Sequence, residues 1–192
     1  MTLRSPPPLD SPLSVVREDG GVQTFDGETL IASGEPLGEL EVDVPAPVSV
    51  VDAEAARKRY AGFAHHAYST CFTCGPDRAD GLGIFAGPVS GRDVVAAPWL
   101  PAPGEVAPEV VWAVLDCPSG WAVDEFQREG VLLGRLAARI VSPVVGAGKP
   151  YVVVGWGTGA EARKRYAGSA VFTAGGELCA YARSTWIVPR AA

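Results

Sequence analysis

The sequence predicts one α+β domain, with or without an appendage, in which short strands outnumber helices. Glycine and proline occur 23 and 17 times in 192 residues, and they separate short runs rich in valine, isoleucine, alanine and aromatic residues. That pattern is typical of a β-rich chain. The expected strands are PLSVV at 12–16, TLIASGE at 29–35, GLGIFAG at 81–87, DVVAAPWL at 93–100, LLGRLAARIVSPV at 132–144, PYVVVGWG at 150–157, AGSAVFTA at 167–174 and ELCAYARSTWIV at 177–188.

Two segments have the composition of helices. The first, at 51–63, has Asp52 as a plausible N-cap and meets Gly62 near its C-terminal side. The second, at 108–121, starts with Pro108 and Glu109, which suit the first turn of a helix. It is apolar on nearly every side, so we expect it to be enclosed by other elements.

The bulk properties exclude some classes of function. A net charge of −6 argues against broad nucleic-acid binding, because neutralising phosphates requires a basic surface. No apolar run approaches the roughly 18 residues of a membrane helix, and the start of the chain has no apolar targeting segment. Four cysteines without a signal peptide indicate a reducing compartment. We therefore expect a cytoplasmic protein that binds neither membrane nor nucleic acid.

The first 50 residues form a β-rich segment distinct from the rest, 51–192. The run at 3–16 followed by GETLIAS at 27–33 resembles the run at 138–154 followed by GELCAYA at 176–182. The first copy has no helix before it, so the segment is either a truncated repeat or a chance likeness between β-rich sequences. Its strand edges must pair with something, either the main sheet or a partner subunit.

A glycine pattern after the strand at 150–157 imitates a dinucleotide fingerprint. Gly155, Gly157 and Ala160 match G-x-G-x-x-A. Only 32 residues follow Ala160, too few for the remaining units of such a fold, so we interpret the segment as a hairpin end.

The stretch CFTCGPDRADGLGIF at 71–85 contains one C-x-x-C pair, Cys71 and Cys74. Packing, metal binding and redox chemistry are all open interpretations. A tetrahedral zinc site would need two more ligands, and the sequence has no second pair. The available partners are His65, His66, Cys117 and Cys179. We favour packing, and expect no metal and no cofactor.

These segments together resemble the hot-dog fold thioesterase superfamily over roughly residues 65–189. Many members have a C-F-x-C-G-P turn followed by Gly-Leu and a strand. About 30 residues later they have a helix ending in Leu-Asp or Leu-Glu, here WAVLD at 112–116. The matching turn residues are Cys71, Phe72, Cys74, Gly75, Pro76, Gly81 and Leu82.

The resemblance implies an α+β hot-dog fold, an antiparallel β-sheet wrapped around a long central helix, with residues 51–192 as the hot-dog domain. Residues 1–50 would be a degenerate or truncated second unit. It also implies a homodimer or higher homo-oligomer with acyl pockets between subunits, and cysteines that need bind nothing.

Asp116 is the acid that the sequence singles out, because it follows an otherwise apolar helical run. Burying such an acid is costly unless it is paired or has a task, and burial raises its pKa. In hot-dog thioesterases the matching acid is the nucleophile or general base on the thioester carbonyl. The alternative is that Asp116 caps the turn at 117–120.

The start of the helix departs from the family, which commonly has His-Gly-Gly there. Counting eight residues back from Asp116 gives Pro108, which has no N–H to donate to an oxyanion. The backbone at Glu109 and Val110 is the remaining candidate for that role, although the Glu109 carboxylate would oppose a developing negative charge.

The resemblance leads us to expect hydrolysis of acyl-CoA or another acyl thioester. Trp112, Ser119 and Trp121 are candidate pocket residues, with Phe126 beside them, and core packing or a turn is the alternative for each. Two other functions stay open. One is a non-catalytic acyl- or CoA-binding protein, and the other is a hydratase or dehydratase, for which the chain offers only His65 and His66 as a histidine partner.

Overall fold

A computed structural model describes residues 1–192 except 104, 124–129, 145, 147 and 191–192. It contains one ten-stranded sheet in which every pairing is antiparallel. The strand order is β2-β3-β4-β1-β7-β10-β9-β8-β6-β5. The strands are β1 (Thr2–Leu3), β2 (Ser14–Glu18), β3 (Gly21–Asp26), β4 (Thr29–Gly34), β5 (Gly87–Pro88), β6 (Val95–Trp99), β7 (Leu132–Ile140), β8 (Tyr151–Glu161), β9 (Lys164–Thr173) and β10 (Leu178–Ile187). The helices are α1 (Val50–Arg57), the 3₁₀ helix η1 (Ala61–Phe63) and α2 (Pro108–Trp121).

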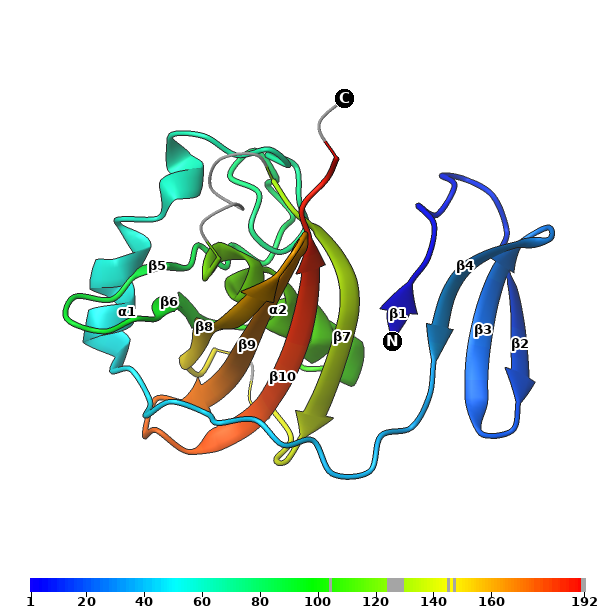
Figure 1. Ribbon diagram of the computed structural model, residues 1–192. Helices are drawn as coiled ribbons and strands as arrows, with labels where there is room; N and C mark the ends of the chain where they lie inside the picture. The colour runs from blue at the N-terminus through cyan, green and yellow to red at the C-terminus, as the bar shows by residue number, and fades with distance from the viewer. Residues whose placement is uncertain (104, 124–129, 145, 147, 191–192) are drawn as a thin grey trace.

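The strands from β7 to β5, with α1 and α2, form the part that we call the body (Figure 1). Alternate residues of a strand face opposite sides of a sheet, and in the body both sides are covered. In β8, Val153 packs on the α2 side, whereas Val152 and Val154 pack on the α1 side. Tyr151–Trp156 are therefore all buried, and the body has a core on each face of one sheet.

Helix α2 begins and ends at the predicted residues and packs against β6 to β10. Val111, Val114 and Leu115 are buried, as its apolar surface predicted. The helix continues through Pro118 without a break. With 14 residues, however, it is shorter than the long central helix that the family resemblance implies. The antiparallel sheet with few helices does agree with the predicted fold class.

Helix α1 differs from the prediction at both ends. Its N-cap is Ser49 and not Asp52, which instead donates its backbone N–H to the Ser49 hydroxyl at 3.1 Å. The Ser49 hydroxyl in turn donates to the Asp52 carboxylate at 2.7 Å. The Ser49 hydroxyl thus satisfies one of the N–H groups of the first turn, as a serine N-cap does, and the helix starts before the predicted residue. The helix ends at Arg57, well before Gly62.

Most predicted strands are present, but residues 81–86 are not a strand. The backbone N–H groups of Leu82 and Ile84 donate to carbonyls of Phe72 and Thr73, at 2.8 and 2.9 Å. Gly83 lies between them with φ of +63°, outside extended geometry. The segment therefore folds back on the C-x-x-C turn. Residues 151–161 form β8, which pairs with β9 as the predicted hairpin.

The N-terminal strands extend the main sheet, which was one of the two expected outcomes. Figure 1 shows β2, β3 and β4 beside the body, with β1 between β4 and β7. Thr2 pairs with Ser33 on β4 and with Arg135 on β7. No helix lies within residues 1–49, all of which are described. None of the helices in the described part of the chain is long and apolar enough to span a membrane.

Candidate functional site

Asp116 lies in the middle of α2, between residues that face the core. Its Oδ1 atom is buried and has no hydrogen-bond partner among the described residues. An unpaired buried carboxylate oxygen is unfavourable, and most buried polar atoms are satisfied. The Oδ1 atom is therefore not bonded to the turn at 117–120, where the Ser119 hydroxyl donates to the Asp116 main-chain carbonyl instead.

The helix backbone around Asp116 is tied to its neighbours by hydroxyl donors. Thr73 donates to the Ala113 carbonyl at 3.2 Å, and Ser169 donates to the Leu115 carbonyl at 2.5 Å. A Cβ at Gly155 would overlap the Pro118 carbonyl oxygen, so β8 and α2 are in direct backbone contact there. These contacts fix the position from which the Asp116 side chain projects.

Burial raises the pKa of Asp116 to about 7, and the nearby Cys71 adds to the rise. Desolvation disfavours the charged form of a carboxyl group, which accounts for the direction. A group with a pKa near neutral is suited to accept and return a proton at pH 7.

The sequence suggested the backbone N–H groups of Glu109 and Val110 as oxyanion donors, and the start of α2 leaves only one of them without a backbone acceptor. Pro108 is the first helical residue, and the N-cap Ala107 gives no side-chain cap. Val110 donates its N–H to the Ala107 carbonyl at 3.0 Å, so this donor is engaged. For the Glu109 N–H, no backbone acceptor occurs in the described ranges.

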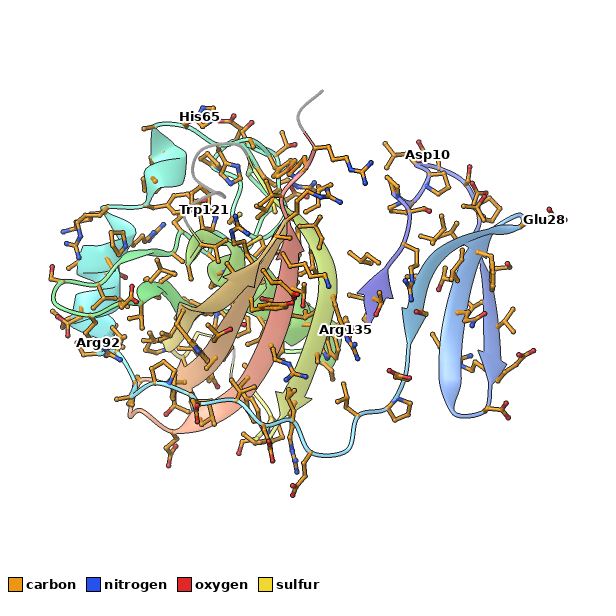
Figure 2. All side chains as sticks on the ribbon, viewed as in Figure 1. Asp10, Glu28, His65, Arg92, Trp121 and Arg135 are labelled. Carbon is orange, nitrogen blue, oxygen red and sulfur yellow. The ribbon has the colours of Figure 1, made fainter. Side chains whose placement is uncertain are left out.

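The three predicted pocket residues lie in different settings. Ser119 is fully buried, donates to the Asp116 carbonyl at 2.7 Å and accepts from Trp186 Nε1 at 2.9 Å. Trp112 is half-buried against the core on the α2 side. Trp121 is buried inside the body (Figure 2) and packs against Tyr60, with ring centroids 4.5 Å apart. Phe126 lies outside the described residues.

Access to Asp116 is limited in a single chain. The hollows on the surface of the described residues include five that Asp116 does not line. One hollow reaches Trp121 and Ala122, at the end of the same helix, between Pro88 and Val95. A ligand would have to reach the Asp116 carboxylate by a route that these hollows do not provide.

The C-x-x-C turn lies directly against α2. The sulfurs of Cys71, Cys74 and Cys117 all lie within 4.8 Å of one another. They are the residues in the described part of the chain that are arranged to hold a metal. The sequence named Cys117 among several partners, but its 46-residue separation from Cys71 gave no spacing signal. His65 is on the surface (Figure 2), whereas His66 faces Cys74.

No family model matches this sequence, and no curated protein matches it either. Its fold is similar to that of a thioesterase superfamily protein, with 20% identity and a TM-score of 0.51 over 60% of this chain and 61% of that one. It is also similar to an uncharacterized protein from Pyrococcus horikoshii, with 14% identity and a TM-score of 0.50 over 63% and 93%.

At these identities the likeness concerns the fold alone. It supports the predicted hot-dog fold. The matched region spans about three fifths of the thioesterase superfamily protein, since it covers 61% of that chain. The activity and partners of this chain are therefore proposals.

Proposed function

We propose that the chain hydrolyses acyl thioesters, acyl-CoA among them, with Asp116 as the catalytic carboxylate. The observation that carries the proposal is the buried Oδ1 atom of Asp116, which has no partner among the described residues. A fold similar to that of a thioesterase superfamily protein supports it. An unpaired oxygen on a rigid helix can accept a hydrogen bond from a substrate or water molecule that reaches it, and the Asp116 residue as a whole is only half-buried.

In the proposed reaction the Asp116 carboxylate accepts a proton from water as the hydroxide adds to the thioester carbonyl. The C–S bond then breaks, and the proton goes to the departing thiolate. The backbone N–H of Glu109 would donate to the oxyanion. Val110 is the weaker choice, because its N–H already bonds to Ala107.

The test is hydrolysis of a panel of short, long and aromatic acyl-CoA thioesters by the wild-type chain and by Asp116→Asn. Removing a general base costs roughly 10²–10⁴ in rate, so we expect kcat/KM to fall by at least about a hundredfold. Asp43→Asn is the matched control, because Asp43 is exposed and remote from α2 in the sequence. Wild-type turnover by a folded Asp116→Asn chain would rule out this role.

Binding without turnover is the second candidate function, and the start of α2 favours it. Pro108 has no N–H to donate, and the Val110 N–H already bonds to the Ala107 carbonyl. The negative charge of the Glu109 carboxylate would oppose an oxyanion. Losing one oxyanion donor costs about 10²–10³ in rate. Thermal stabilisation by the thioesters without hydrolysis of any would establish this function instead.

We also propose a homodimer, and the sheet restricts how it forms. On the outer edge of β7 only Arg135 is in register with β1, so most of that edge, together with β2 and β5, has no strand partner among the described residues. Sedimentation equilibrium of the chain used in the assay tests this. A monomer at the assay concentration would contradict it.

A further inference from the structure

Three cysteine sulfurs, which we call the cysteine cluster, meet where the loop after η1 contacts α2. Cys71 and Cys74 come from the loop, and Cys117 comes from the helix. Their Sγ atoms all lie within 4.8 Å of one another, and those of Cys71 and Cys117 are 3.6 Å apart. Cys74 and Cys117 are buried, and Cys71 is half-buried. Two distant parts of the chain thus supply ligand atoms to one point.

The spacing of the sulfurs suits a tetrahedral ion. With a metal–sulfur distance of about 2.3 Å, two sulfurs on a tetrahedral zinc lie about 3.8 Å apart. The Cys71–Cys117 separation of 3.6 Å is close to this value. The side chains would need only small shifts to bind an ion between them.

The turn that carries Cys71 and Cys74 has a tightly packed backbone. The Gly75 N–H donates to the Cys71 carbonyl at 2.8 Å. A Cβ at Gly75 would overlap backbone atoms of Cys71 and Ser69. Only glycine fits at this position, so the backbone that carries Cys71 and Cys74 has a fixed path.

The second sulfur of the turn is approached by two ring nitrogens. Trp121 donates Nε1–H to Cys74 Sγ at 3.4 Å, and His66 Nε2 lies 3.3 Å from the same sulfur. His66 Nδ1 accepts the Tyr68 N–H at 2.9 Å, so the proton of the neutral ring lies on Nε2. His66 is therefore a hydrogen-bond donor to Cys74 and not a metal ligand in this arrangement.

We propose that Cys71, Cys74 and Cys117 bind one thiophilic divalent metal ion, zinc by preference, as thiolates. Three sulfurs in one cluster are a soft ligand set, which selects zinc over magnesium or calcium. Trp121 and His66 place two N–H donors on the Cys74 sulfur, and such donors stabilise a metal-bound thiolate. No fourth His, Cys, Asp or Glu among the described residues lies within 4.8 Å of all three sulfurs, so we assign the remaining position to solvent.

The ion would fasten the loop to α2, one residue from Asp116. Cys117 directly follows Asp116 in the helix, so the loop, the ion and the candidate acid would form one rigid unit. Binding releases the thiol protons, and its free energy adds to the stability of the folded chain.

The test is the metal content of the full chain, purified under reducing conditions and measured by mass spectrometry. We expect about one zinc per chain. Titration with Co²⁺ alone should then give the thiolate-to-cobalt charge-transfer band and the visible absorption of a tetrahedral site. Losing an outer partner of a metal ligand weakens binding about 10–100-fold, so Cys117→Ser should lower affinity for Co²⁺ by more than this.

Cys179→Ser is the matched control, because Cys179 is equally buried but lies on β10, outside the cluster. It should bind metal as the wild type does. If Cys117→Ser does not fold, Cys71→Ser is the second variant, because Cys71 is half-buried and its loss disturbs the core less. The cobalt titration of the wild type tests the proposal without any variant. A chain with four reduced thiols, no bound metal and no cobalt charge-transfer band would overturn the proposal. A Cys71–Cys117 disulfide in the reduced preparation, or unchanged metal affinity in Cys117→Ser, would overturn it too.

Discussion

The N-terminal strands and the body belong to one hydrogen-bonded sheet, but they are covered very differently. In β2 every residue is exposed, and within residues 1–34 only Ile31 is buried. In β8 of the body six consecutive residues are buried. Neither of the two core clusters includes a residue from 1–34. Backbone pairing alone therefore continues a sheet, but helices on its faces are what produce a core.

The largest contrast should come from adding one methyl group to a glycine in each region. Gly155→Ala places a Cβ on the Pro118 carbonyl, and the nearest atoms are all backbone of α2, which cannot move aside as a flexible side chain can. We expect the free energy of unfolding to fall by about 3 kcal/mol or more. Denaturant unfolding monitored by tryptophan fluorescence measures this change.

Gly34→Ala in β4 is the matched substitution. Its Cβ would meet no heavy atom within 4 Å, and the change restricts the unfolded chain. We expect the free energy of unfolding either to stay unchanged or to rise by up to about 1 kcal/mol. Equal losses at the two glycines would contradict the difference between the regions.

A smaller contrast should come from removing methyl groups from matched valines. Val153 in β8 is fully buried, whereas Val16 in β2 is 38% exposed. Val153→Ala loses two buried methyl groups and leaves a cavity, so unfolding should become easier by about 2 kcal/mol. Val16→Ala should change it by less than about 0.5 kcal/mol. Urea titrations of the two variants, compared at equal m-value, check the pair; similar losses would mean that β2 is covered in solution.

The smallest effect is expected at the boundary between the regions. Arg135 on β7, labelled in Figure 2, lies 3.6 Å from the Glu35 carboxylate, and both side chains are well exposed. Exposed ion pairs contribute little, so Glu35→Gln should change stability by less than about 0.5 kcal/mol. Thermal melts at low and high salt provide the measurement, with the exposed Glu39→Gln as control. A loss above about 1 kcal/mol would show that the boundary is stronger than its exposure suggests.

Much of the body could be predicted because its signals are local. The helix at 108–121 has Pro108 at its first position and a continuous apolar surface, and β8 to β10 are rich in β-branched and aromatic residues between glycines. β3 was missed because GVQTFD has few apolar residues, and β1 because it has two residues in a proline-rich segment. Both depend on pairing with strands elsewhere in the chain, which local composition does not encode.

The candidate site was only partly predictable, for the same reason. An acid after an apolar helical run indicates burial, and Asp116 has a buried carboxylate oxygen. That Val110 would bond to Ala107 depends on how the first turn closes around Pro108. The approach of Cys117 to Cys71 depends on the loop folding against α2 across 46 residues. Neither spacing nor residue type carries that information.

The shortness of β1 has a consequence for how the protein can vary. The backbone connection between the N-terminal strands and β7 is the pairing of Thr2 with Arg135, reinforced by the Met1 amine donating to the Leu136 carbonyl at 2.9 Å. A change in β2 or β3 has only this short pairing, the Glu35–Arg135 ion pair and the connecting segment at 35–49 through which to act on the body. Substitutions can therefore accumulate in residues 14–26 during evolution while selection holds the surroundings of Asp116 unchanged, and the two regions can diverge at different rates.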